Sequence, residues 1–235
     1  MSVDYILFDC METLIDLYKL PAAEDYAMWA FKGSGVESLW RGFDSFFSCY
    51  TAARQDLNAS LPTYAESELR GQFFKTLQLD APQLDRPGME HAADMLYRNY
   101  WKNYKAGCYV KEEVESALKY LSATFRMGVV SNFRVMGGIE ELLDMLDIRK
   151  YFSFVVTSVA VGIKKPHHDI YNEAVKLSGT SAGRIVFVGD DYVNDYLTPL
   201  ALGMKAVYYD KYGRHPEAEP RFADFAELPK ILSGY

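Results

Sequence analysis

Short apolar strings recur along the chain, and helix-length segments separate most of them. The strings are rich in β-branched and aromatic residues and lie at Tyr5–Phe8, Met127–Val130, Phe154–Val156, Ile185–Val188 and Ala206–Tyr209. Between the later strings, apolar residues recur at helical spacing in Glu112–Thr124, Gly138–Leu146 and Ile170–Leu177. Uninterrupted apolar strands are typical of parallel sheets that are buried on both faces. Their alternation with helices predicts an α/β fold, a doubly wound, Rossmann-like parallel sheet.

The first string is followed by a long segment without a strand pattern. The stretch 21–105 has the pattern of successive helices, with breaks at Gly33-Ser34-Gly35, Leu61-Pro62-Thr63 and Asp85-Arg86-Pro87-Gly88. We therefore predict a core formed by 1–16 and 106–235, with an all-helical domain inserted at 17–105. A chain of 235 residues with 49% hydrophobic residues can bury such a core without disulfide bonds or a structural metal.

The composition limits the class of molecule that the protein can be expected to bind. The net charge is −7 and no long basic block is present, which argues against a nucleic-acid-binding surface. No run approaches the roughly 18 apolar residues of a membrane span, and no export signal is visible. Three widely spaced cysteines support neither disulfides nor a zinc site, so we expect a cytoplasmic protein. A small anionic molecule is the expected partner, and the sequence leaves the oligomeric state undetermined.

Chemically versatile residues follow the predicted strands, at once for Asp9 and Ser131 and several residues later for Lys165. In open α/β sheets, ligands bind at the carboxyl ends of the strands, so these residues should converge on one site. The residues in question are Asp9, Ser131-Asn132, Lys165 before Pro166, and Asp190 with Asp195. Together they supply a carboxylate nucleophile, a hydroxyl, a cation and an acidic cluster. Each of them alone has an ordinary explanation as a cap, turn or surface residue, and only the joint placement favours a site.

These four motifs, in this order, resemble those of the haloacid dehalogenase superfamily. The resemblance spans the chain and implies a capped hydrolase, with the helical insertion as the cap that selects the substrate. It implies that Asp9 is the nucleophile and forms an aspartyl intermediate. It also implies that Ser131 and the backbone N–H of Asn132 hold substrate oxygens, and that Lys165 neutralises charge between nucleophile and substrate.

The same resemblance implies a Mg²⁺ cofactor. The ion would be bound by Asp9, the backbone carbonyl of Met11 and Asp190. Asp195 or Asp191 would help to hold it without contacting it directly. Oxygen ligands with few carboxylates suit magnesium. Because Met11 contributes only its carbonyl, its side chain does not affect this prediction.

Met11 is the chain's departure from the phosphatase pattern, which carries a second aspartate at this position. A thioether cannot protonate a leaving alkoxide, a contribution typically worth about 10²–10⁴-fold in rate. The neighbouring Glu12 is a weaker candidate for the acid, because adjacent residues of an extended segment point to opposite sides. The first hypothesis is therefore a Mg²⁺-dependent, phosphatase-like hydrolase that turns over unactivated esters poorly.

Two alternatives remain open. The superfamily's 2-haloacid dehalogenases need no proton for their leaving halide and carry a non-acidic residue at the position of Met11. Leu39-Trp40-Arg41 resembles their carboxylate-binding segment, with Arg41 as the substrate-binding residue, but those metal-free enzymes lack an acid at Asp190. The phosphonoacetaldehyde hydrolases would need a cap lysine that no pattern selects. The second alternative is a non-catalytic, metal- or phosphate-binding module.

Overall fold

The computed structural model describes residues 2–81 and 83–235 and divides into two compact units. Unit 1 joins the N-terminal residues up to Asp16 with Tyr109–Tyr235, and unit 2 is Leu17–Cys108. The chain crosses between the units where the short strands β2 (Asp16–Leu17) and β3 (Cys108–Tyr109) pair with each other.

Unit 1 contains a six-stranded parallel sheet in the order β5-β4-β1-β6-β7-β8. Its strands are β1 (Tyr5–Phe8), β4 (Arg126–Ser131), β5 (Phe154–Thr157), β6 (Ile185–Gly189), β7 (Lys205–Tyr209) and β8 (Arg221–Phe222). The predicted doubly wound parallel sheet is confirmed. The two-residue β8 was not predicted, since it is too short to carry an apolar pattern.

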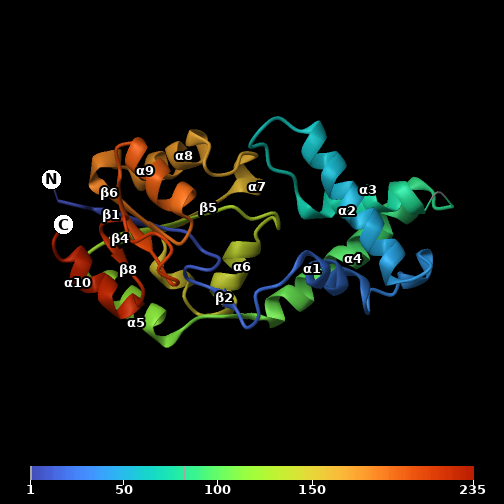
Figure 1. Cartoon of the computed structure of the whole chain (residues 1–235), viewed down its shortest axis with the longest axis horizontal. Helices are drawn as coiled ribbons and strands as arrows, with labels where there is room; N and C mark the ends of the chain where they lie inside the picture. Colours follow the sequence, from blue (N-terminus) through green and yellow to red (C-terminus); the bar gives the residue numbers. More distant parts are fainter. Residues whose placement is uncertain (1, 82) are drawn as a thin grey trace. The chain divides into compact units, whose positions relative to one another are not determined.

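Helices cover both faces of this sheet. They are α5 (Glu112–Leu121), α6 (Gly138–Met145), α7 (Ser158–Val161), α8 (His168–Ser178), α9 (Thr198–Ala201) and α10 (Leu228–Leu232), with the short turns η2 (Arg149–Tyr151), η3 (Ala182–Arg184) and η5 (Phe225–Glu227) and the π-helix η4 (Tyr192–Leu197). Figure 1 shows α8 and α9 on one side of the sheet and α5 and α6 on the other. The central strands β1 and β6 are fully buried, which explains their continuous apolar sequences.

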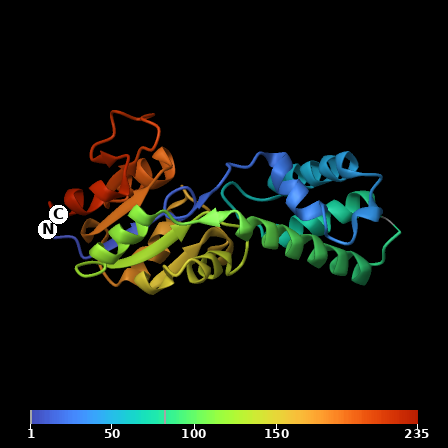
Figure 2. The same cartoon turned by 90° about the horizontal axis from the view of Figure 1, so that it is seen from below.

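Unit 2 is helical, as predicted for the insertion. It contains α1 (Ala23–Phe31), η1 (Glu37–Leu39), α2 (Phe43–Ser60), α3 (Leu69–Asp80) and α4 (Arg86–Ala106). Figure 2 shows the four α-helices packed together, with α4 running the length of the group. The Asn99 amide donates to the carbonyls of Trp29, Ala30 and Lys32, which satisfies the carboxyl end of α1. Within the described residues, no helix has both the length and the apolarity that crossing a bilayer demands.

The strand register brings the predicted site residues to one edge of the sheet. Phe8 at the end of β1 pairs with Val129 on one side and Val188 on the other. Asp9 therefore leaves β1 close to where β4 ends in Ser131 and where β6 leads into Asp190. Residues that are far apart in sequence thus reach a common pocket through parallel pairing.

Candidate active site

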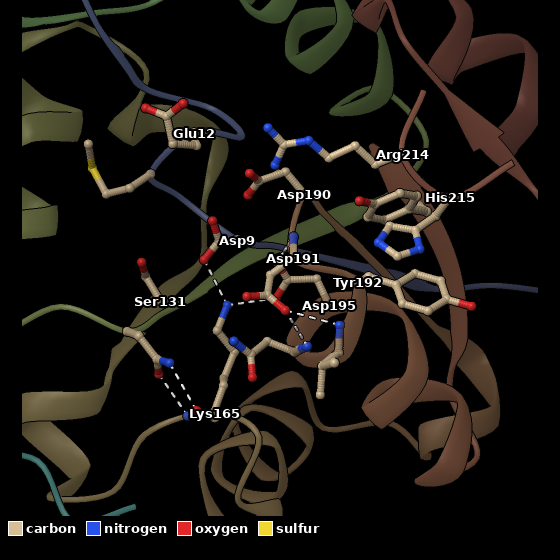
Figure 3. Close-up of a pocket in the computed structure, with 15 residues that line it drawn as sticks. Asp9, Glu12, Ser131, Lys165, Asp190, Asp191, Tyr192, Asp195, Arg214 and His215 are labelled. Carbon is tan, nitrogen blue, oxygen red and sulfur yellow. Dashed lines mark hydrogen bonds and ion pairs between the residues drawn. The ribbon is translucent and has the colours of Figure 1, made fainter. Parts of the chain in front are cut away.

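A pocket of about 630 Å³ opens at this edge of the sheet, and the described residues that line it belong to unit 1. Its lining residues are Asp9, Met11, Glu12, Ser131, Asn132, Lys165, Asp190, Asp191, Tyr192, Val193, Asn194, Asp195, Tyr208, Arg214 and His215. Figure 3 shows Asp9, Ser131, Lys165, Asp190 and Asp195 gathered around its floor. The four predicted motifs therefore meet in one cavity.

Lys165 connects two of the carboxylates. Its buried Nζ lies 2.7 Å from Oδ1 of Asp9 and 2.8 Å from Oδ1 of Asp195, and it also donates to the carbonyl of Val130 at 3.0 Å. Burial alone would lower the pKa of Lys165, but Asp195 and Asp9 outweigh it and hold the pKa above its ordinary value. The ammonium group stays charged beside Asp9, while the neighbouring carboxylates have their charge partly neutralised.

Asn132 fixes the backbone from which Lys165 projects. Its Oδ1 accepts the Lys165 N–H at 2.7 Å, and its Nδ2 donates to the Lys165 carbonyl at 3.0 Å. The side chain is thus used for positioning, which leaves only the backbone N–H for the predicted contact with substrate. Ser131, at the end of β4, is buried and lines the same pocket.

Asp190 faces Asp9 across the pocket floor. One oxygen from each of Asp9, Asp190 and Asp195 lies within 4.8 Å of the other two. Burial, followed by the charge of Asp9, raises the pKa of Asp190 to about 7, although the Thr13 hydroxyl donates to its Oδ1 at 3.2 Å. Oxygens this close repel one another unless a cation lies between them, and carboxylate oxygens are what Mg²⁺ prefers.

The π-helix η4 positions Asp195. Asp191 precedes it, and its side chain accepts the N–H groups of Val193 and Asn194 at 3.0 and 2.8 Å. The second oxygen of Asp195 accepts the Asp191 N–H at 3.1 Å. Both oxygens of Asp195 thus have partners, Lys165 and the backbone, while Asp191 is occupied as a helix cap. Single π-turns are frequent at functional sites.

The loop after Asp9 is a tight turn and not an extended segment. The Cys10 carbonyl accepts the N–H groups of Thr13, Leu14 and Ile15, and Glu12 has φ of +63°. The extended segment on which the expectation for Glu12 rested is therefore absent here, and both Met11 and Glu12 line the pocket. Glu12 lies 3.4 Å from Nζ of Lys211, which in turn binds Asp16 at 2.8 Å.

Several residues at the site were not among those predicted from the sequence. Thr13, Tyr192, Tyr208, Arg214 and His215 reach the site from the turn after β1, from η4, and from the end of β7 and the loop that follows it. Position after a strand is the signal that could have found Thr13, Tyr192, Arg214 and His215, whereas Tyr208 lies within β7 itself. Arg41 belongs to unit 2, where its exposed side chain lies between η1 and α2, and its role stays a prediction.

Comparison with known proteins settles the family. A profile described as "Haloacid dehalogenase-like hydrolase" matches residues 48–209. "Haloacid dehalogenase-like hydrolase domain-containing protein 3" of Mus musculus is 31% identical over 214 residues, which cover 87% of this chain and 80% of that protein. The chain is a haloacid dehalogenase-like hydrolase. The frog counterpart, from Xenopus laevis, is 41% identical over 96 residues, and the match spans only 36% of its length.

Other relatives differ in activity. A "Glyceraldehyde 3-phosphate phosphatase" of Pyrococcus furiosus is 24% identical to the hydrolase over 98% of this chain and 92% of that one. A 2-haloacid dehalogenase from Pseudomonas syringae superposes with a TM-score of 0.80 at 20% identity, covering 99% of both chains. A phosphatase from Thermococcus onnurineus gives 0.67 at 19% identity, covering 100% and 99%. At these identities the structural likeness establishes the hydrolase's fold, which both activities share.

Proposed function

We propose that this hydrolase is a Mg²⁺-dependent, phosphatase-like enzyme that acts on a small anionic phosphate ester with Asp9 as nucleophile. The observation that carries the proposal is the pair Asp9 and Asp190, two close carboxylates at the floor of a pocket. Lys165 is already shared between Asp9 and Asp195, so a second cation would balance Asp190. Unit 2 would act as the cap that selects the substrate.

The residues of the pocket divide the work of phosphoryl transfer. A carboxylate oxygen of Asp9 would attack phosphorus, forming an aspartyl phosphate as the bond to the leaving oxygen breaks, and water would then hydrolyse that intermediate. Lys165 donates a hydrogen bond to Asp9 at 2.7 Å and would offset the negative charge of the incoming phosphate. Ser131 and the backbone N–H of Asn132 would orient the phosphate oxygens.

The donor set suits Mg²⁺. Asp9, Asp190 and the carbonyl of Met11 would hold the ion, which would supply electrophilic stabilisation of charge on the transferring group. Thr13 orients Asp190, and Asp195 anchors Lys165, so we assign Asp195 a positioning role. These oxygens come from the carboxyl ends of two adjacent strands, β1 and β6.

Leaving-group protonation is the weak point of this site. Met11 has no proton to give, and the carboxyl group of Glu12 is engaged by Lys211 at 3.4 Å. The enzyme should therefore prefer esters whose alkoxide or phenolate departs without help.

The dehalogenase alternative draws support from Met11 and from Arg41. Asp190 opposes it, because a further carboxylate beside the nucleophile would repel the carboxylate of a 2-haloacid unless a metal ion were bound. Halide release from short-chain 2-haloacids in the presence of a chelator would favour the dehalogenase and count against the phosphatase.

The direct test is phosphate release from an aryl phosphate with and without millimolar Mg²⁺. We expect Mg²⁺-dependent turnover that Asp9→Asn abolishes. Asp144→Asn, on the exposed side of α6, is the matched control and should turn over like the wild type. Turnover that survives in Asp9→Asn would show that a different group attacks.

A further inference from the structure

The loop after β7 brings two basic side chains, Arg214 and His215, to the rim of the pocket. The buried carboxylate of Asp210 holds this loop, since it accepts the N–H of Arg214 at 2.8 Å and the N–H of His215 at 3.3 Å. Arg221 also approaches Asp210, at 3.5 Å. The buried carboxylate of Asp210 therefore fixes the backbone positions of both residues.

His215 is held in a defined orientation. Its ring lies parallel to that of Tyr192, with centroids 3.9 Å apart and planes inclined by 3°. Its Nδ1 lies 2.9 Å from Oε1 of Glu217, and the hydrogen bond to His215 lowers the pKa of that carboxyl. Because an ionised carboxylate can only accept, Nδ1 carries a proton toward Glu217; in the imidazolium form Nε2 is a donor as well and is available to an anion.

Arg214 is a pocket cation that no described carboxylate pairs with. Its guanidinium lies over the exposed ring of Tyr212, 4.7 Å from the centroid, and no described residue forms an ion pair with it. Lys165, by contrast, is shared between two aspartates. An arginine fork that is oriented by an aromatic ring is suited to binding a carboxylate or phosphate.

The two basic residues lie on the side of the pocket away from Ser131. In the view of Figure 3, Ser131 is on one side of Asp9; on the other side the Arg214 guanidinium is drawn next to Asp190, and His215 lies farther away. A cavity of about 630 Å³ is within the range that takes whole small molecules, well beyond one phosphate group. A substrate whose phosphate lay at Asp9 would extend its remaining part toward this rim.

We propose that Arg214 and His215 select phosphate esters whose leaving portion carries a second anionic group, a carboxylate or a second phosphate. This inference rests on the proposed function, because it assumes that a phosphate occupies the floor. It assigns substrate recognition to the core of the enzyme, in addition to whatever the cap supplies. The negative net charge of the chain makes such a local basic pair necessary for an anion with several charges.

The test measures binding alone, with two phosphonates that have no ester bond to break. 2-Carboxyethylphosphonate has a carboxylate at the position where propylphosphonate has a methyl group. Both compounds are titrated calorimetrically into the wild-type protein in the presence of Mg²⁺. We expect the carboxylate to tighten binding about tenfold, equivalent to about 1.4 kcal/mol. Arg214→Gln should remove most of that gain and His215→Gln part of it. Ethane-1,2-diphosphonate, titrated in parallel, shows whether a second phosphate is preferred to a carboxylate.

Arg126→Gln is the matched control, because Arg126 lies at the opposite end of β4 and should leave the ratio of the two affinities unchanged. Equal affinities of the two phosphonates in the wild type would overturn the inference and leave the phosphatase proposal standing. The same tenfold ratio in Arg214→Gln and His215→Gln would also overturn it. Failure of both phosphonates to bind would overturn the inference together with the proposed function.

Discussion

Gly189 and Asp195 approach so closely that no side chain fits between them. A β-carbon built on Gly189 would lie 2.4 Å from Oδ2 of Asp195, far inside van der Waals contact. Gly189 ends β6, and Asp195 holds Lys165 at 2.8 Å. Because Gly189 has no side chain at the end of the strand, there is room for the carboxylate that anchors Lys165.

Gly189→Ala should damage both stability and catalysis. The added methyl group must displace Asp195, and overpacking of this kind costs about 1–3 kcal/mol of unfolding free energy. With its anchor shifted, Lys165 should hold Asp9 less precisely, so the rate of phosphate release should fall more than its KM rises. Gly183→Ala is the control, because its nearest neighbour would be 3.9 Å away and both properties should be preserved. A fully active Gly189→Ala protein would contradict the positioning role of Asp195.

Met11→Asp should increase phosphatase activity. The substitution supplies the missing proton carrier, a group worth about 10²–10⁴-fold, and the gain should be larger for alkyl than for aryl phosphates because alkoxides are poorer leaving groups. Steady-state kinetics on both ester types test this. Met145→Asp, at an exposed site in α6, is the control for added charge. The gain should disappear in the double variant with Asp9→Asn, and the absence of any gain in folded, Mg²⁺-bound protein would refute the assignment of the missing acid.

Mg²⁺ should stabilise the protein through Asp190. A ligand that binds only the folded state at 100 times its Kd adds about 2.7 kcal/mol to the free energy of unfolding. Thermal denaturation at increasing Mg²⁺ should show a rising Tm for the wild type and a much smaller rise for Asp190→Asn. Asp144→Asn should shift as the wild type does. Identical shifts in all three proteins would place the metal elsewhere.

Asp16 should make stability depend on pH. Its carboxylate lies 2.8 Å from Nζ of Lys211 and 2.9 Å from Nζ of Lys111. Burial alone would raise the pKa of Asp16, but the two lysines outweigh it and lower the pKa below its ordinary value. The folded state thus binds this proton less readily than the unfolded state, whose pKa is about 3.9. The stabilisation is present above that pH and is lost as the pH falls through the lower folded pKa.

We therefore expect Asp16→Asn to lower the free energy of unfolding by about 1.5–3 kcal/mol at pH 7, with the difference shrinking as the pH drops below about 4. Urea denaturation at several pH values measures this. Asp147→Asn is the control, because Asp147 pairs with Lys150 on an exposed surface, where a salt bridge contributes about 0–1 kcal/mol. A difference that persisted unchanged to pH 2 would contradict the ionic explanation.

The strands, the helical insertion and the sequence order of Asp9, Ser131, Lys165 and Asp190 could be predicted because each depends on local pattern. A buried parallel strand needs a continuous apolar string, and the residue after it must emerge at the carboxyl edge of the sheet. The convergence of these four on one pocket followed from the fold class, even though they are spread over most of the chain.

Other parts of the site depend on backbone turns and long-range contacts that no local pattern encodes. Glu12 adopts a left-handed conformation, so its segment does not have the geometry of an extended strand. Thr13 binds Asp190 across 177 positions, and Arg214 reaches the pocket because Asp210 holds its loop. A hydrogen bond between distant segments depends on where packing of the whole sheet brings them. The sequence by itself therefore determined which residues end the strands, and the tertiary structure decided which side chains orient them and what else lines the pocket.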